Sequence, residues 1–178
     1  MLIDPLAPPV APLLVIVMGV AGSGKTTVGA LLASELECPF WDADSFHSDA
    51  SIHKMRSGTP LTDDDRAPWL RTLREQVVNA VIIGNGCGVL ACSSLKVRHR
   101  QILAEGTDRV RFVYLRITPE LARMRVERRP AHFMNPGLVD SQFAELEEPQ
   151  SAIVVDASLP PAAIVDAIRR ELHAPERR

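Results

Sequence analysis

One short stretch has the residue types and spacing of a loop that wraps the phosphates of a nucleotide. Residues 19–26 read Gly-Val-Ala-Gly-Ser-Gly-Lys-Thr, which fits the pattern Gly-x-x-x-x-Gly-Lys-Ser/Thr. In this pattern the lysine reaches the β- and γ-phosphates and the next hydroxyl holds Mg²⁺, which assigns these tasks to Lys25 and Thr26. The candidate nucleotide-binding residues are Gly19, Gly22, Ser23, Gly24, Lys25, Thr26 and Thr27. The alternative is a glycine-rich turn that binds nothing, and the complete match argues against it.

The segments on either side can hold such a loop in place. Residues 13–18 form an apolar run typical of a buried parallel strand. Residues 27–36 place Val28, Leu31, Leu32 and Leu36 on one face of a helix. Strand, loop and helix therefore follow in the required order, and the N–H groups of the loop converge on an anion at the positive end of the helix.

Two carboxylates follow the next apolar segment. Residues 39–41 predict a short strand, and Asp42 and Asp44 come directly after it, where a parallel strand delivers residues to a ligand crevice. An ionised acid there can accept the proton of an attacking hydroxyl or hold Mg²⁺ through water. The alternative is an acidic loop that caps the next helix, which is predicted at residues 48–57.

A basic residue follows a strong helix start. Thr62 and Asp65 have the spacing of a capping box ahead of a predicted helix that runs to about residue 83. We interpret Asp63 and Asp64 as a solvated helix start that the helix dipole favours. Arg66 can form a bidentate pair with a substrate carboxylate, or it can form an ion pair within its own helix. The sequence leaves both interpretations open.

The second half of the chain adds a polar strand end and a group of arginines. A strand predicted at residues 87–92 ends in Ser93 and Ser94, which we expect to cap the helix that holds Lys96. A role for Ser93 and Lys96 at the edge of the crevice is the alternative. The helix after a fourth strand, predicted at residues 110–117, carries Arg123, Arg125, Arg128 and Arg129. A lid over about residues 123–140 can bring such charge to a moving phosphoryl group, and a solvated basic face is the alternative.

The alternation of strands and helices sets the fold class. A fifth strand is predicted at residues 153–155, ahead of a last helix that opens with Pro160 and Pro161. This order predicts a three-layer α/β fold, in which helices flank a five-stranded parallel sheet. The length of 178 residues suits one domain. We expect a flexible leader over residues 1–12 and a single domain over residues 13–178.

Composition narrows the partners and the compartment. The chain has 20 Lys+Arg against 22 Asp+Glu and a formal charge of −2. It therefore lacks the excess of positive charge that favours binding to nucleic acid or to an anionic membrane surface. No apolar run approaches transmembrane length. Three cysteines without metal-ligand spacing suit a reducing compartment, and we expect a cytoplasmic protein. His47 and His53 lack the second partner of a zinc site, so no zinc is predicted.

Taken together, these stretches closely resemble the small phosphate-loop gluconokinases, which are relatives of shikimate kinase and the nucleoside monophosphate kinases. The resemblance covers nearly everything from Val15 to Leu172. The phosphate loop alone indicates only a nucleotide, and the other stretches specify the acceptor. The most specific stretches are residues 19–29, Asp42 to Asp44 with His47, Lys54-Met55, residues 58–70, residues 91–96, His132-Phe133-Met134, Ser141-Gln142-Phe143, Leu146-Glu147 and Pro149.

The resemblance implies a phosphate-loop kinase that uses ATP and Mg²⁺ to phosphorylate D-gluconate at its 6-hydroxyl. Asp44 would be the base or the acid that orients the hydroxyl, and it would also reach Mg²⁺ through water, beside Thr26. Arg125 and Arg129 match lid positions, and Arg66 is expected near the gluconate carboxylate. The other candidate gluconate contacts are His47, Lys54, Ser93, Lys96, His132 and Gln142. Members of the family are commonly homodimers.

Three positions depart from the family pattern, and two rival functions stay open. Ser51 stands where the family usually has Asn, His99 replaces a usual Tyr, and Ala131 replaces a Gly. We expect these changes to alter lid closing or acceptor affinity before they alter the reaction. One rival is another small-molecule kinase, of the shikimate or nucleotide type. The other is a nucleotide-binding module that regulates a partner, which the retained Asp44 and the lid arginines argue against.

Overall fold

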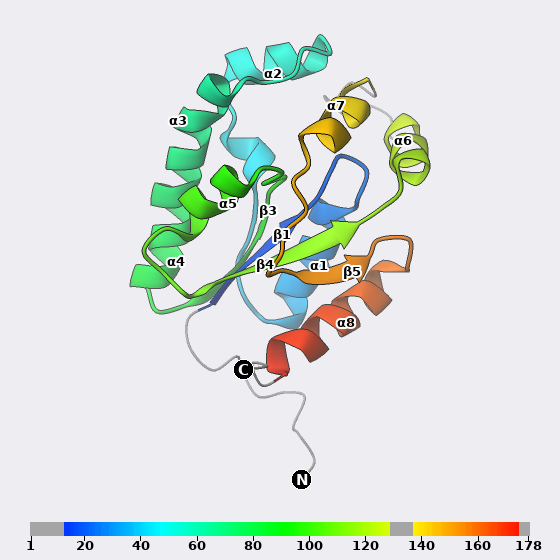
Figure 1. Cartoon of the computed structure of the whole chain (residues 1–178). Helices are drawn as coiled ribbons and strands as arrows, with labels where there is room; N and C mark the ends of the chain where they lie inside the picture. The colour runs from blue at the N-terminus through cyan, green and yellow to red at the C-terminus, as the bar shows by residue number, and fades with distance from the viewer. Residues whose placement is uncertain (1–12, 129–136, 175–178) are drawn as a thin grey trace.

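The fold is built on one parallel sheet, which a computed structural model shows within residues 13–128 and 137–174, the residues that the structure describes. The strands are β1 Leu13–Met18, β2 Phe40–Asp42, β3 Cys87–Ala91, β4 Val110–Arg116 and β5 Ile153–Asp156. They lie in the order β2-β3-β1-β4-β5, and every neighbouring pair is parallel (Figure 1). The predicted α/β fold with a five-stranded parallel sheet is therefore confirmed.

Helices connect the strands and cover both faces of the sheet. They are α1 Lys25–Glu35, α2 Asp49–Arg56, α3 Asp63–Leu73, α4 Asn79–Ile83, α5 Val97–Ala104, α6 Pro119–Glu127, α7 Leu138–Glu145 and α8 Pro161–His173. A short 3-10 turn at Ala43–Phe46 follows β2, and a π-helical turn at Arg74–Val78 joins α3 to α4. The predicted helix up to residue 83 is thus continuous, and the π-helical turn widens it locally.

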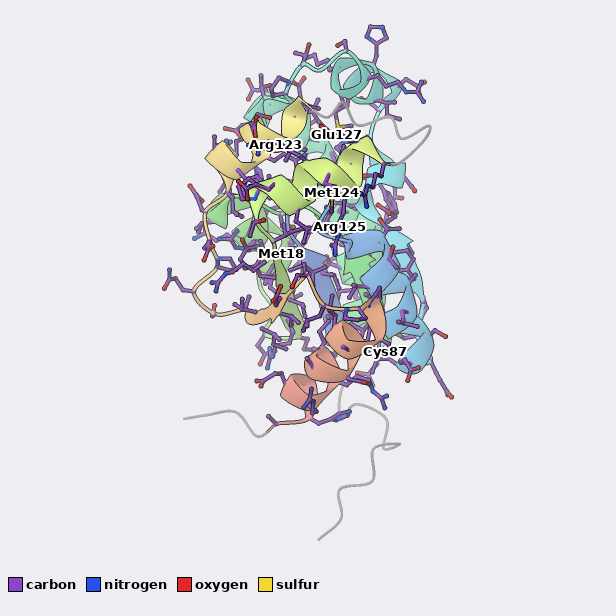
Figure 2. All side chains as sticks on the ribbon, turned by 90° about the vertical axis from the view of Figure 1, so that its right-hand side faces the viewer. Met18, Cys87, Arg123, Met124, Arg125 and Glu127 are labelled. Carbon is purple, nitrogen blue, oxygen red and sulfur yellow. The ribbon has the colours of Figure 1, made fainter. Side chains whose placement is uncertain are left out.

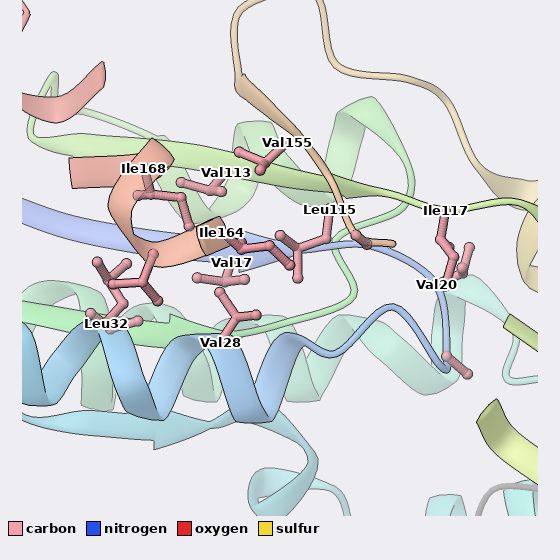
Figure 3. Packing of buried hydrophobic residues seen from close by; sticks show 14 of the residues in the cluster. Val17, Val20, Val28, Leu32, Val113, Leu115, Ile117, Val155, Ile164 and Ile168 are labelled. Carbon is pink, nitrogen blue, oxygen red and sulfur yellow. The ribbon is translucent and has the colours of Figure 1, made fainter. Parts of the chain in front are cut away.

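The central strand β1 packs against a different apolar cluster on each face, because successive side chains of a strand point in opposite directions. Val15 and Val17 belong to the cluster with α1 and α8, which Figure 3 shows from close by with Leu32 and Ile164. Leu14 and Ile16 belong to the cluster under α3, the π-helical turn, α4 and α5, which includes Leu70, Leu73, Val77, Val81 and Leu103. The sheet is therefore the middle one of three layers.

The carboxyl ends of the three strands β2, β3 and β1 meet at one edge of the sheet. The chain leaves β1 at Gly19, β2 at Ala43 and β3 at Cys92. In an open parallel sheet ligands bind outside the carboxyl ends of the strands. The phosphate loop and both predicted strand-end acids consequently lie on the same side of the molecule.

Two local predictions have different outcomes. The capping box of α3 is confirmed, because the Thr62 hydroxyl accepts from the Asp65 N–H and the Asp65 carboxylate accepts from the Thr62 N–H. The predicted serine cap of α5 is wrong, because α5 starts at Val97 and its N–H donates to the Glu147 carboxylate instead. Ser94 has a positive φ of 43° and its hydroxyl donates to Cys92 Sγ, so it turns away from the helix.

None of the helices in the two described ranges combines the length with the apolar character that crossing a membrane requires.

Candidate active site

The phosphate loop has a backbone that only glycine adopts easily. Gly22 and Gly24 have φ angles of 82° and 97°, in the left-handed region that L side chains avoid. A Cβ on Gly22 would also lie 2.5 Å from the carbonyl oxygen of Ala122 in α6. Gly24 is the N-cap of α1, so the loop ends at the positive end of that helix. The motif therefore has the shape that a bound phosphate needs.

Two side chains of the loop are arranged for an anion. The Ser23 hydroxyl is buried and has no hydrogen-bond partner among the described residues. Lys25 folds back so that its ammonium donates to the Val20 carbonyl at 3.0 Å. An unpaired buried hydroxyl costs free energy, on the order of 1–3 kcal/mol, which a phosphate oxygen would recover. The loop thus fits a nucleotide phosphate.

The two strand-end acids have different surroundings. The Asp42 carboxylate accepts from the Thr26 hydroxyl at 2.8 Å and from the Asp44 N–H at 3.0 Å. A hydroxyl beside a carboxylate is the set of hard oxygen donors that Mg²⁺ prefers, so Thr26 and Asp42 fit this ion. The sequence alone does not distinguish Asp42 from Asp44. The contact with Thr26 makes Asp42 the better candidate for a ligand of the metal ion.

Asp44 instead lines a pocket that opens beside the phosphate loop. The pocket brings Lys25 of the phosphate loop together with most of the acceptor-side candidates: Asp44, His47, Arg66, Ser93 and Gln142. Its other walls are Ala21, Met55, Pro60, Leu61, Trp69, Leu95, Leu138 and Ser141. Lys25 and Asp44 therefore face the same space, although they belong to different loops.

The imidazole ring of His47 forms part of the wall of this pocket and is neutral at pH 7. Its ring stacks on Trp69 with centroids 4.4 Å apart, and the Trp69 N–H donates to the Ala43 carbonyl at 2.8 Å. Burial, together with the nearby charge of Arg66, lowers the pKa of His47 to about 4. Its Nδ1 has no hydrogen-bond partner among the described residues, so it can contact a polar ligand.

Arg66 reaches the pocket from α3 and is held from the opposite side. Its Nη2 lies 2.8 Å from Glu145 Oε2 in α7, and its Nη1 lies 3.9 Å from Asp63 Oδ1 in its own helix. The ion pair within the helix is therefore the weaker of the two, and the pair between helices dominates. Sequence reasoning missed Glu145, although it lies one helical turn after Gln142 and so on the same face of α7.

Lys54 and Lys96 do not line the pocket. The Lys54 ammonium lies 2.7 Å from Asp65, whose pKa falls to about 2 through this bond and those from Thr62. The Lys96 ammonium lies 3.0 Å from Asp63, and Arg98 also pairs with Asp63. Asp63 lies at the start of α3 as predicted, but it is not simply solvated, because Lys96, Arg98 and, at 3.9 Å, Arg66 surround its carboxylate.

Helix α7 is tied directly to the phosphate loop. The Gln142 side-chain oxygen accepts from the Ala21 N–H at 2.7 Å. Arg123 of α6 pairs with Asp140 at the start of α7, where its Nη2 lies 2.6 Å from the carboxylate. The acceptor pocket is thus closed on one side by a helix that also contacts the phosphate loop.

A second hollow lies on the other side of the phosphate loop. It is lined by Gly22, Ser23, Gly24, Thr27, Val28, Arg125, Arg128, Ala157, Leu159, Pro161 and Ile164. Arg125 Nη1 lies 3.5 Å from the Gly22 carbonyl, and Figure 2 shows Arg123 and Arg125 on α6. Arg128, which the resemblance did not favour, lines this hollow beside Arg125. The predicted contacts Arg129 and His132 lie outside the described residues.

Comparisons with known proteins identify the family of this chain. The sequence profile described as shikimate kinase matches residues 21–171. A probable gluconokinase of Mus musculus is 41% identical over 183 residues, which cover 89% of this chain and 99% of that protein. The thermosensitive gluconokinase of Escherichia coli (strain K12) is 43% identical over 136 residues, which cover 76% of this chain and 72% of that protein.

A solved structure of a gluconokinase is also similar to this chain. The crystal structure of a gluconokinase from Sinorhizobium meliloti 1021 superposes with a TM-score of 0.80 at 36% identity, over 90% of this chain and 91% of that one. The chain therefore belongs to the shikimate kinase family, as that profile defines it, and within it to the gluconokinases.

Proposed function

We propose that this chain transfers the γ-phosphoryl group of ATP to the 6-hydroxyl of D-gluconate, giving 6-phospho-D-gluconate and ADP. The family relationship supports the acceptor, because the relatives at 41% and 43% identity carry the name gluconokinase. The single observation that carries the proposal is that Lys25 and Asp44 line one pocket together with Arg66. A phosphate-binding cation, a carboxylate base and a carboxylate-binding guanidinium are the three groups that this reaction needs.

The residues have separate tasks in the reaction. Asp44 orients the 6-hydroxyl and accepts its proton as the new oxygen–phosphorus bond forms and the bond to the β-phosphate oxygen breaks. Lys25 stabilises the charge on the phosphoryl oxygens. Arg66 binds the gluconate carboxylate at the far end of the pocket, with His47, Ser93 and Gln142 as the hydroxyl contacts. We propose Arg125 and Arg129 as the lid arginines.

Mg²⁺ is the ion that this chemistry requires, and Thr26 and Asp42 are the residues that would hold it. When bound, the ion neutralises charge on the β- and γ-phosphates. The hydrogen bond between Thr26 and Asp42 fixes the hydroxyl, so that its lone pairs stay available to a cation. Asp44 stays in the proposal as a second acid that reaches the ion through water.

The proposed function is tested by coupled assays of the purified protein with ATP, Mg²⁺ and a panel of acceptors. The panel contains gluconate, shikimate and nucleoside monophosphates, and Lys25→Ala serves as the control for a contaminating kinase. We expect gluconate-dependent ADP release that Lys25→Ala lowers at least about a hundredfold. Turnover of shikimate or a nucleotide in place of gluconate would overturn the assignment.

We also propose a homodimer, which the resemblance to the gluconokinases supports, and a cytoplasmic location, which the cysteine pattern supports. The three cysteines Cys38, Cys87 and Cys92 are free thiols in the structure, as a reducing compartment requires. Sedimentation at micromolar concentration tests the dimer, and fractionation of the source cells tests the location.

A further inference from the structure

Arg66 lies between two carboxylates that compete for it. Glu145 at the end of α7 is 2.8 Å from Nη2, whereas Asp63 in the first turn of α3 is 3.9 Å from Nη1. The Arg66 side chain is only 13% exposed, and the Glu145 side chain is 23% exposed against 39% for Asp63, so solvent weakens the pair with Glu145 less than the pair with Asp63. The position of the guanidinium therefore depends on the balance between α7 and its own helix.

The surroundings of Asp63 favour the α7 side. Asp63 already accepts from Lys96 at 3.0 Å and pairs with Arg98, both from the segment that begins α5. Two basic partners satisfy much of the hydrogen-bonding capacity of one carboxylate. Asp63 therefore interacts only weakly with Arg66, and Arg66 pairs with Glu145 instead. Lys96 and Arg98 thus affect the pocket indirectly, through the carboxylate that they occupy.

Several polar atoms around Arg66 have no hydrogen-bond partner. Arg66 Nη1, Glu145 Oε2, His47 Nδ1 and His99 Nε2 are buried and lack such a partner among the described residues, so Glu145 and Arg66 form an ion pair without the geometry of a hydrogen bond. Burial and the charge of Arg66 lower the pKa of both histidines to about 4, so they are neutral at pH 7. Clustered unpaired polar atoms beside a pocket point to a polar ligand. A carboxylate supplies acceptors for Nη1.

From these contacts we infer that Glu145 is a positioning residue, which holds the Arg66 guanidinium off Asp63 and so leaves Nη1 for the carboxylate of the acceptor. This inference rests on the proposed function, because it takes a sugar acid as the acceptor. Glu145 itself does not line the pocket, and it acts through Arg66. Without Glu145, the guanidinium moves toward Asp63 and the carboxylate site loses its donor.

Two substitutions separate position from charge. Glu145→Ala removes the contact, whereas Glu145→Gln keeps the side-chain length and an acceptor oxygen while removing the negative charge. We expect Glu145→Ala to raise the KM for gluconate on the order of tenfold, with kcat and the KM for ATP within about threefold of wild type. Glu145→Gln should raise the KM for gluconate less than Glu145→Ala does, because it keeps the side-chain volume and an acceptor oxygen beside the guanidinium while it loses the charge.

The outcomes decide between the possible roles of Glu145. If both variants lower the KM for gluconate, Glu145 competes with the substrate and the inference is wrong. An unchanged KM in Glu145→Ala overturns it as well. Glu148→Gln is the matched control, because this exposed carboxylate pairs with Arg116 outside the pocket, and it should leave every kinetic constant unchanged. In an Arg66→Ala background, Glu145→Ala should add no further loss.

A structural readout keeps this inference separate from the proposed function. Crystal structures of the two variants without substrate should show Arg66 moved onto Asp63 in Glu145→Ala and displaced less in Glu145→Gln. An unmoved Arg66 in Glu145→Ala overturns the positioning role, whatever the substrate is. Failure of the wild-type protein to phosphorylate gluconate would instead overturn the proposed function and leave this structural result to stand by itself.

Discussion

The two sides of the phosphate loop are built in different ways. The hollow that we propose for the nucleotide, called the nucleotide side below, is lined by Gly22, Ser23, Gly24, Thr27 and Val28, together with Arg125, Arg128 and the start of α8. The acceptor side collects residues from the ends of β2 and β3, from α2, α3 and α7, and from the loop itself. A phosphate can be bound by local backbone geometry, whereas a particular sugar acid needs groups that only the folded chain brings together.

The charges differ as well. Arg66, which lines the acceptor pocket, pairs with Glu145, and two lysines outside the pocket lining are paired as well: Lys54 with Asp65, and Lys96 with Asp63. On the nucleotide side Arg125 contacts a carbonyl of the phosphate loop, beside the polyanion that the loop would bind. The difference suits a polyanionic nucleotide on one side and a hydroxyl-rich monoanion on the other, since a balanced pocket does not attract every anion.

The largest expected effect concerns Asp44. Replacing Asp44 by Asn removes the proton acceptor and keeps the shape of the side chain, so kcat should fall at least about a hundredfold. Steady-state kinetics measure this, and isothermal titration checks that gluconate still binds. Turnover within tenfold of wild type would show that the acceptor side does not take part in the proton transfer.

Loss of the guanidinium should weaken binding more than turnover. Arg66→Ala removes charge-assisted hydrogen bonds worth about 1.5–3 kcal/mol, so the KM for gluconate should rise roughly 10- to 100-fold. The KM for ATP should stay within about threefold, because ATP binds on the other side of the loop. An unchanged KM for gluconate would remove Arg66 from the acceptor pocket.

A matched acid tests the metal side. Asp42→Asn weakens the orientation of the Thr26 hydroxyl, so the Mg²⁺ concentration for half-maximal rate should rise on the order of tenfold. Asp44→Asn should change this concentration less, because Asp44 lines the acceptor pocket. If the two variants have the same Mg²⁺ dependence, the division of work between the acids is wrong.

His47 should make the acceptor side sensitive to acid. Its pKa is 6.5 in the unfolded chain and about 4 in the fold, so the unfolded state takes up the proton first. The stability that neutral His47 contributes is complete above pH 6.5 and is lost as the pH falls toward 4. His47→Phe keeps a ring against Trp69, and its Tm should fall less steeply than that of wild type between these pH values. Equal slopes by calorimetry would contradict the burial argument.

The smallest effect is expected at Lys54. This partly exposed ammonium pairs with the half-buried Asp65 and lies outside the pocket lining, so Lys54→Met should change the KM for gluconate less than about fivefold. The resemblance implied a direct contact with the acceptor. A rise above tenfold in the same assay would restore that contact and would mean that the pocket reaches further toward α2.

The sequence predicted the parts of the molecule whose causes are local. Apolar runs identify the strands, because a parallel strand is buried on both faces, and the phosphate loop and the Thr62–Asp65 capping box depend on residues close together in the chain. The contacts that partners far apart in sequence make were not predicted. Asp63 with Lys96, 33 residues away, and Arg66 with Glu145 become neighbours only when the helices pack. The wrong serine cap of α5 has the same cause, since Glu147 comes from a distant segment.

The most direct test of the two-sided site is a crystal structure with gluconate, Mg²⁺ and a non-hydrolysable ATP analogue bound together. The account predicts the 6-hydroxyl within about 2.6–3.2 Å of the Asp44 carboxylate, in line with the γ-phosphate, and the gluconate carboxylate at Arg66. A gluconate that binds away from Asp44, or that presents its carboxylate to the phosphate loop, would contradict it.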